Sequence, residues 1–407
     1  MRTSSERLAL TLLIGHLVLL CCAGKHYAKI AVFGPLYVTE VCLIVTALLS
    51  WRSVAAVPWD RLTNLVALFL AFGVCWAVLG GIGDPGGAGE KAFSFFVYSA
   101  FYFIVRGLAR DDDARWRVLY GVALATIGAA VIGLIQKRTG VPLFDPSERF
   151  EVTTTGSTRW LTGEYAVYAE VGMSVPAVAA IITRRFGRAS TLLMISAAVE
   201  LVLAQHRSGF VAAGVALFAT STFISGSAQA ARGLLKLVVF GTLAIGLYLL
   251  LFGGGYLGET VNRVSTTTDF QDNNIYWRLN TAYEVLGAVI AQPLGHGFST
   301  WDFSFTFVDP LTGSHNDYAD LAYRIGVPGL VAFLALPVSL IRQTRQLAQH
   351  TGPAPQLLAV TVCAALLAFL IFASFNVVLE SPQVSILFWV LLGLGAGSVH
   401  DARASLP

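Results

Sequence analysis

The chain has 407 residues, of which 56% are hydrophobic and only 13% are charged, and its mean hydropathy is +0.69. Soluble domains contain about 45–50% apolar and about 25% charged residues, so this composition excludes a soluble protein and predicts a polytopic membrane protein. The net charge of +3 is dispersed, without the basic block that follows nucleic-acid phosphates, which excludes nucleic acid as a partner.

Apolar stretches of the length that a membrane-crossing helix needs follow one another through most of the chain. The first resembles a secretory signal, but further stretches follow at once, and we interpret it as a retained first helix. The pattern predicts an all-α integral membrane protein with about 12 transmembrane helices in a single domain, residues 1–407. The expected spans lie near 8–23, 29–50, 63–82, 91–109, 116–136, 163–183, 189–205, 209–225, 234–253, 326–343, 356–376 and 382–399.

The distribution of Lys and Arg predicts the orientation. An even number of spans puts both termini on one side of the membrane, and cytoplasmic segments carry an excess of Lys and Arg. With the termini inside, the inner segments hold 16 of the 27 Lys and Arg residues, whereas the short outer loops hold four. We therefore expect cytoplasmic termini. Three features then face outward: the loop 137–162, the turn 206–209 and the long segment 254–325.

Within the long outer segment, residues 273–293 predict an amphipathic helix. Its apolar residues recur at helical spacing, at positions 275, 279, 282, 286 and 290. Asn274, Arg278 and Thr281 share another face, so we expect the helix to lie on the bundle or in the membrane interface and to present Arg278 to a polar cavity. Pro293 ends the helix, and the glycines of PLGHGFST predict a tight turn near the membrane surface.

Two more residues place charge at the outer end of a span. Arg207 lies in the short turn AQHRSGF, where a guanidinium must face water, a headgroup or an anion, because at the bilayer centre it costs at least about 2.5–3.5 kcal/mol. His315 precedes the apolar run that begins at 326. Taken singly, Arg207 is explained as a membrane anchor, His315 as a helix cap and Arg278 as part of a solvated face. Their shared side of the membrane favours one site.

Cofactor and metal chemistry are not indicated. All five cysteines lie inside apolar runs without zinc-binding spacing, and they are interpreted as buried hydrophobic residues. No outer carboxylate pair has Asp-x-Asp spacing, and the run 111–113 falls on the inner side, where it predicts a solvated loop. We therefore expect a reaction without metal or cofactor.

His315 and Asn316, followed after nine residues by Gly326 to Gly329, resemble the H-[NSQ]-x9-G-x-x-[GTY] pattern of bacterial O-antigen ligases. The similarity extends to an Arg in the small turn, Arg207, and an Arg in the long loop, Arg278. A Pro-x-Gly-x-Gly turn of the family is matched by Pro293, Gly295 and Gly297. Residues 1–200 resemble the family only in hydropathy.

The resemblance implies a glycosyltransferase in the bacterial inner membrane, with 254–325 as a large periplasmic loop that bears part of the active site and carries amphipathic helices. The implied donor is a glycan on undecaprenyl pyrophosphate, the acceptor is a sugar hydroxyl of lipid A-core, and membrane lipid surrounds the site. Arg207 and Arg278 would stabilise the departing pyrophosphate. His315 would act as general base or, when protonated, as a third cation. Asn316, Arg149, Arg159 and His296 are the expected substrate-binding residues.

Other functions remain open. O-antigen polymerases and protein O-oligosaccharyltransferases belong to the same superfamily. Neither Arg207 nor Arg278 begins the R-x10-G motif usual in polymerases, and the chain ends just after its last span, without the soluble domain usual in oligosaccharyltransferases. A secondary transporter is the alternative from another class, with the intramembrane carboxylates Glu40, Glu170 and Glu200 as candidates. The absence of an internal repeat in the sequence argues against it.

Overall fold

The computed structural model of the chain describes residues 3–28, 30–33, 36–81, 88–144, 160–161, 163–183, 188–204, 208–216, 218, 273–298, 316–351, 356–376 and 378–404. In the helix that begins at residue 273, side chains are described from Asn280 onward. Four predicted site residues, Arg149, Arg159, Arg207 and His315, lie outside the described residues. So do the span expected near 234–253 and half of the loop 254–325, namely 254–272 and 299–315.

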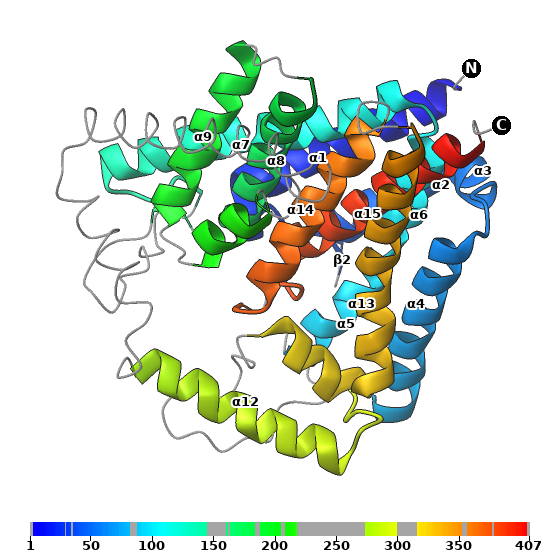
Figure 1. Cartoon of the computed structure of the whole chain (residues 1–407). Helices are drawn as coiled ribbons and strands as arrows, with labels where there is room; N and C mark the ends of the chain where they lie inside the picture. Colours follow the sequence, from blue (N-terminus) through cyan, green and yellow to red (C-terminus); the bar gives the residue numbers. More distant parts are fainter. Residues whose placement is uncertain are drawn as a thin grey trace.

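Helices make up almost all of the described chain, as predicted (Figure 1). Their bounds are α1 Ser4–Ala28, α2 Val38–Leu49, α3 Trp51–Ala55, α4 Arg61–Gly80, α5 Ala88–Tyr98, α6 Ala100–Leu108, α7 Asp112–Thr139, α8 Gly163–Thr183, α9 Arg188–Ala204, α12 Asn273–Ala291, α13 Asp317–Thr351, α14 Leu357–Ala373 and α15 Pro382–Ala404. Two short strands, β1 Ala31–Phe33 and β2 Leu36–Tyr37, form an antiparallel pair.

Five of the described helices are long and apolar enough to cross a membrane: α4, α7, α13, α15 and the Ser4–Gly24 part of α1. Shorter apolar helices are α2, α14 and the stretch Ala92–Leu108. The fold is therefore that of an all-helical membrane protein, and each expected span within the described residues coincides with helix over at least part of its length.

Two expected spans differ from a single continuous helix. The segment expected at 29–50 begins with the β1–β2 pair, and its helix starts only at Val38. Gly34-Pro35 lies between the strands in the sequence, and proline cannot donate the backbone hydrogen bond that an earlier helix start would need. The segment expected at 91–109 is divided at Ser99, where the backbone keeps helical angles, so α6 follows α5 almost without a break.

The helix α15 runs through the centre of the bundle (Figure 1). Its sequence is apolar all round, the pattern of a helix that is surrounded by protein. The largest side chain in it, Trp389, is fully buried and donates its indole N–H to the Phe95 carbonyl at 3.0 Å. Gly393 allows the backbone of Tyr102 to approach, because a Cβ at this position would meet that backbone at 2.8 Å. The core thus forms around the last helix.

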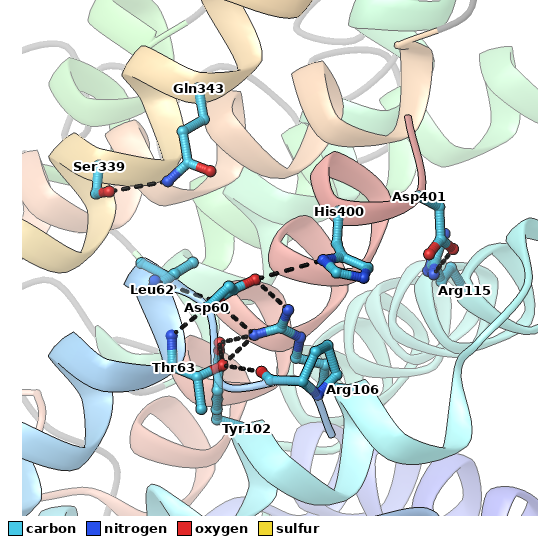
Figure 2. A network of polar contacts seen from close by, with 11 residues as sticks. Asp60, Leu62, Thr63, Tyr102, Arg106, Arg115, Ser339, Gln343, His400 and Asp401 are labelled. Carbon is cyan, nitrogen blue, oxygen red and sulfur yellow. Dashed lines mark hydrogen bonds and ion pairs between the residues drawn. The ribbon is translucent and has the colours of Figure 1, made fainter. Parts of the chain in front are cut away.

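The start of α1 and the end of α15 lie at the same end of the bundle (Figure 1), where buried arginines hold the helices together (Figure 2). Asp60 caps α4 by accepting from the amides of Leu62 and Thr63 at 3.1 and 3.0 Å. Both terminal nitrogens of Arg106, in α6, donate hydrogen bonds to this carboxylate, and His400 of α15 lies 3.7 Å from it. Burial favours a raised pKa for Asp60, but the hydrogen bonds from Arg106 and Thr63 outweigh it, and the pKa lies below the usual value.

Candidate functional site

At the opposite end of the bundle, α13 bends at Gly326. The first turns of α13 precede this glycine, and the long membrane-crossing part follows it (Figure 1). Gly326 has φ 74° and ψ 175°, a conformation that is open essentially only to glycine. A Cβ on Gly326 would also collide with the backbone of Leu294, in the turn after α12. Glycine is required here for both backbone conformation and space.

The turn after α12 pairs with this bend through backbone hydrogen bonds. The amide of His296 donates to the Tyr323 carbonyl at 2.7 Å, and the amide of Gly297 donates to the Arg324 carbonyl at 2.9 Å. The amide of Val327 in turn donates to the Pro293 carbonyl at 2.9 Å. We refer to residues 293–297 and 323–327 together as the glycine junction. The junction joins two motifs, the Pro-x-Gly-x-Gly turn and the G-x-x-G stretch. The spacing of these motifs in the sequence did not predict that they are in contact.

His296, a predicted substrate-binding residue, lies in the glycine junction. Its ring stacks on that of Tyr323 with centroids 4.3 Å apart and planes 2° apart. Its Nδ1 lies 3.2 Å from the Tyr323 carbonyl oxygen, and the side chain is half-buried. These contacts fix the imidazole against the first part of α13. Its role in substrate binding stays a prediction.

Asn316 caps the N-terminus of α13. Its side-chain oxygen accepts from the amides of Tyr318 and Ala319 at 2.9 and 3.1 Å, an arrangement for which Asn is among the preferred residues. Its side-chain nitrogen donates to the Ser374 carbonyl at 3.0 Å, at the start of the loop between α14 and α15. Asn316 therefore has a structural role in fixing the start of α13. The substrate-binding role expected of it stays a prediction beside that finding.

The loop between α14 and α15 holds several segments of the candidate site together. The buried carboxylate of Asp317 accepts from the amides of Val378 and Leu379, at 3.1 and 3.2 Å for the nearer oxygen. Asn376 of the same loop donates to the hydroxyl of Ser208 at 2.8 Å. Residues that follow Arg207 and His315 directly in the chain are thus bound to one loop.

A buried ion pair joins the same loop to α13. Arg324 lies 3.3 Å from Glu380, and the two side chains are 2% and 19% exposed. Arg324 is seven residues after Asp317, so both project from one face of the helix. The prediction of site residues omitted Arg324 and Glu380. An arginine at the edge of an apolar run was the available signal.

Arg278 lies in the first half of α12, on the helix face that carries Thr281 and Val285 in the following turns. Thr281 is buried, and Val285 and Val289 pack against Ala322 and Tyr323 of α13. The shared face predicted for Arg278 and Thr281 therefore belongs, from Thr281 onward, to the docked side of α12. The structure thus indicates which face of α12 meets the protein.

The carboxylates considered for a transporter have different surroundings. Glu40 accepts from the Tyr37 amide at 3.0 Å and from the Tyr98 hydroxyl at 2.8 Å, so it completes the cap of α2. Glu170 and Glu200 are buried in α8 and α9, and neither has a hydrogen-bond partner in the described part of the chain. In the same part of the chain, no three His, Cys, Asp or Glu side chains are grouped as they would be to hold a metal ion.

Comparison with known families locates the similarity in the second half of the chain. Residues 192–334 match a family model described as O-antigen ligase. The matched range contains α12, the glycine junction and the bend of α13, together with the positions of Arg207, Arg278 and His315. The resemblance predicted from the sequence is confirmed over this range. No curated protein matches the chain.

Proposed function

We propose, from the O-antigen ligase family domain that residues 192–334 carry, that the protein transfers O-antigen glycan from undecaprenyl pyrophosphate to a sugar hydroxyl of lipid A-core. A family domain of this type supports an enzyme of the ligase and polymerase superfamily acting on a lipid-linked glycan. The donor, the acceptor and the residue roles given below belong to the proposal.

One observation carries the assignment of the site: Ser208 and Asn316 are both bound to the loop between α14 and α15. Consecutive Cα atoms are about 3.8 Å apart, and Arg207 and His315 each directly precede a residue that this loop holds in place. Contacts of this kind support a site in which the guanidinium and the imidazole approach one substrate.

The glycine junction supports the assignment of the third residue. It fixes the C-terminal end of α12 to the bend of α13, and from there α12 extends away along that end of the bundle (Figure 1). Arg278 lies 13 residues before the last residue of α12, about 20 Å along the helix axis. A rigid helix anchored at one end can hold Arg278 at a defined distance from the junction.

In the proposed reaction, the acceptor hydroxyl oxygen attacks C1 of the donor sugar while the bond from C1 to the pyrophosphate oxygen breaks. Arg207 and Arg278 stabilise the negative charge that develops on the departing pyrophosphate, because planar guanidinium groups match phosphate oxygens and stay ionised. His315 accepts the hydroxyl proton. A single displacement of this kind needs no metal and inverts the anomeric configuration.

His315 has a second possible role, as a protonated third cation that binds the pyrophosphate. A general base loses activity as the pH falls through the histidine pKa, whereas a cationic binder loses activity as the pH rises through it. The pH dependence of the transfer rate decides between these two roles.

The proposal includes about 12 transmembrane helices, cytoplasmic termini in the bacterial inner membrane, and a site open to the periplasm within one domain, residues 1–407. Two observations support this orientation. The chain ends and the buried Arg106 and Arg115 share one end of the bundle, which fits the excess of Arg expected in the cytoplasm. The glycine junction contacts Gly80, at the far end of α4 from Asp60.

The product of the reaction tests the proposal. Purified full-length protein in lipid nanodiscs would be incubated with glycan on undecaprenyl pyrophosphate and with lipid A-core, with and without a chelator. The proposal expects glycan joined to lipid A-core and the same rate in the presence of chelator. A lengthened lipid-linked glycan would identify a polymerase, and glycan on protein would identify an oligosaccharyltransferase. Flux of the lipid-linked glycan in proteoliposomes, without any transfer, would identify a transporter.

A further inference from the structure

The helix α12 has three different faces between Asn280 and Ala291. The first is formed by Thr281, Val285 and Val289, which are all buried, and its two valines pack against α13. Successive helical residues are separated by about 100°, which places Leu286 and Ile290 on a second face and Glu284 on a third. Each face is therefore about a third of a turn from the next.

The second face is apolar and exposed. Ile290 is 71% exposed, and Leu286 is also exposed beside it. The sequence places Ile275, Leu279 and Ala282 on the same stripe, at the positions that predicted an amphipathic helix. The prediction left open whether this stripe packs on the bundle. From Ala282 onward it does not face α13, because Val285 and Val289 occupy that contact.

The exposed stripe of α12 continues onto helices of membrane-crossing length. Gly297, in the glycine junction, packs against Gly80 at the end of α4, where Val78 and Leu79 are exposed. Val327, whose amide donates a hydrogen bond to the Pro293 carbonyl, is exposed at the start of the long part of α13. Exposed aliphatic side chains on a membrane-crossing helix face lipid. The apolar stripe of α12 therefore continues a surface that contacts the bilayer.

We propose that α12 is an interfacial helix whose stripe of Leu286 and Ile290 inserts among the lipid chains at the edge of the bilayer. One face then meets α13, one meets lipid and one meets water, which matches the three faces observed. Transfer of a Leu or Ile side chain from water to an apolar environment is favourable, so bilayer contact favours this position over exposure to water. A helix held in this way keeps its polar residues at the level of the lipid headgroups.

Site-specific photocross-linking tests the insertion of α12 without reference to glycan transfer. The photoreactive residue p-benzoylphenylalanine would replace Leu286, Ile290 or Glu284, one at a time, in the full chain. A fourth variant at Val78 gives the lipid adduct yield of a membrane-crossing helix. Each variant would be reconstituted in nanodiscs of phosphatidylethanolamine and phosphatidylglycerol, irradiated, and analysed by mass spectrometry of the intact protein.

The proposal predicts lipid adducts at Leu286 and Ile290 with a yield similar to that at Val78, and at least about fivefold above that at Glu284, which faces water. Equal yields at Leu286, Ile290 and Glu284 would overturn it. Cross-links from Leu286 or Ile290 to a second copy of the chain, in place of lipid, would also overturn it and would identify the stripe as a contact between protein molecules.

Discussion

Asn376 donates a hydrogen bond to the hydroxyl of Ser208 at 2.8 Å and joins the residue after Arg207 to the loop that also binds Asn316. Asn376 also donates to the Phe372 carbonyl at 3.0 Å, so its side chain fixes the end of α14 at the same time. The loop between α14 and α15 therefore connects two parts of the family domain that are more than a hundred residues apart in sequence.

Replacement of Asn376 by Ala tests this connection. The variant loses the bonds to Ser208 and Phe372, which we expect to reduce stability by about 1–3 kcal/mol. If Arg207 acts in the site, displacement of its neighbour lowers the transfer rate by about tenfold or more. The matched control is Gln343→Ala, which removes the hydrogen bond that the Gln343 side-chain amide donates to the hydroxyl of Ser339, drawn in Figure 2. Equal transfer rates in the two variants would contradict a positioning role for Asn376.

Replacement of Gly326 by Ala tests the glycine junction. The new side chain meets the backbone of Leu294, and the positive φ adds about 1–3 kcal/mol of strain. We therefore expect a lower melting temperature and a loss of transfer activity. The control Gly287→Ala adds the same methyl group within α12 at a position with open space, where it is neutral or stabilises by about 0.5–1 kcal/mol. A wild-type melting temperature for Gly326→Ala would show that the junction tolerates a side chain.

Replacement of Glu380 by Gln tests the buried ion pair. It leaves the buried guanidinium of Arg324 without the negative charge of Glu380, and loss of one partner of a buried pair typically destabilises by about 3–5 kcal/mol. Asp401→Asn is the matched control at the other end of the bundle, since Asp401 pairs with the buried Arg115 but is half exposed. We expect the melting temperature to fall more for Glu380→Gln than for Asp401→Asn. The reverse order would contradict this account of the pair.

The lowered pKa of Asp60 predicts how the stability of the terminal end depends on pH. A carboxylate whose pKa is lower in the folded state than in the unfolded state stabilises the protein above its unfolded value, and this stabilisation is lost as the pH falls through the folded value. Asp60→Asn removes the negative charge that pairs with Arg106 and keeps a side-chain oxygen that can cap α4. We expect its deficit in melting temperature to be constant above about pH 5 and to shrink below about pH 4.

The control for the pH experiment is Asp112→Asn, because Asp112 is exposed where it pairs with Arg115. Its stability difference from the wild type should be small at every pH. A deficit of Asp60→Asn that grows on acidification would contradict the assigned direction of the pKa shift. Melting temperatures in detergent between pH 3 and about pH 7 provide the measurement.

Most of the helices could be predicted from apolar periodicity, because the membrane requires long runs of apolar residues that form their own hydrogen bonds. The segment 29–50 was predicted less well, since strands and helices of about equal hydrophobicity give the same apolar signal. The number of spans, their orientation and the periplasmic placement of 254–325 stay predictions.

The residues assigned to the site stay a prediction, and the contacts around them were not predicted. His315, Arg207 and Arg278 were selected from their shared placement in the outer segments and from the family pattern, and their roles stay predictions. The pairing of residues 293–297 with the bend at Gly326 depends on backbone geometry, which the spacing of glycines does not encode. The capping role of Asn316 could be predicted from the preference for Asn at helix N-termini. Its hydrogen bond to Ser374 could not, because 58 residues separate the two.

The transfer rate of four variants tests the central proposal most directly. Purified wild-type protein, His315→Ala, Arg207→Ala, Arg278→Ala and the control Arg117→Ala would be assayed in nanodiscs with undecaprenyl pyrophosphate-linked glycan and lipid A-core. We predict a loss of about 10²–10⁴-fold for His315→Ala and of about 10²-fold or more for each of the two site arginines. Arg117→Ala, which removes an exposed guanidinium from α7, should keep the wild-type rate. Wild-type transfer by all three site variants, in normally inserted protein, would contradict the proposal.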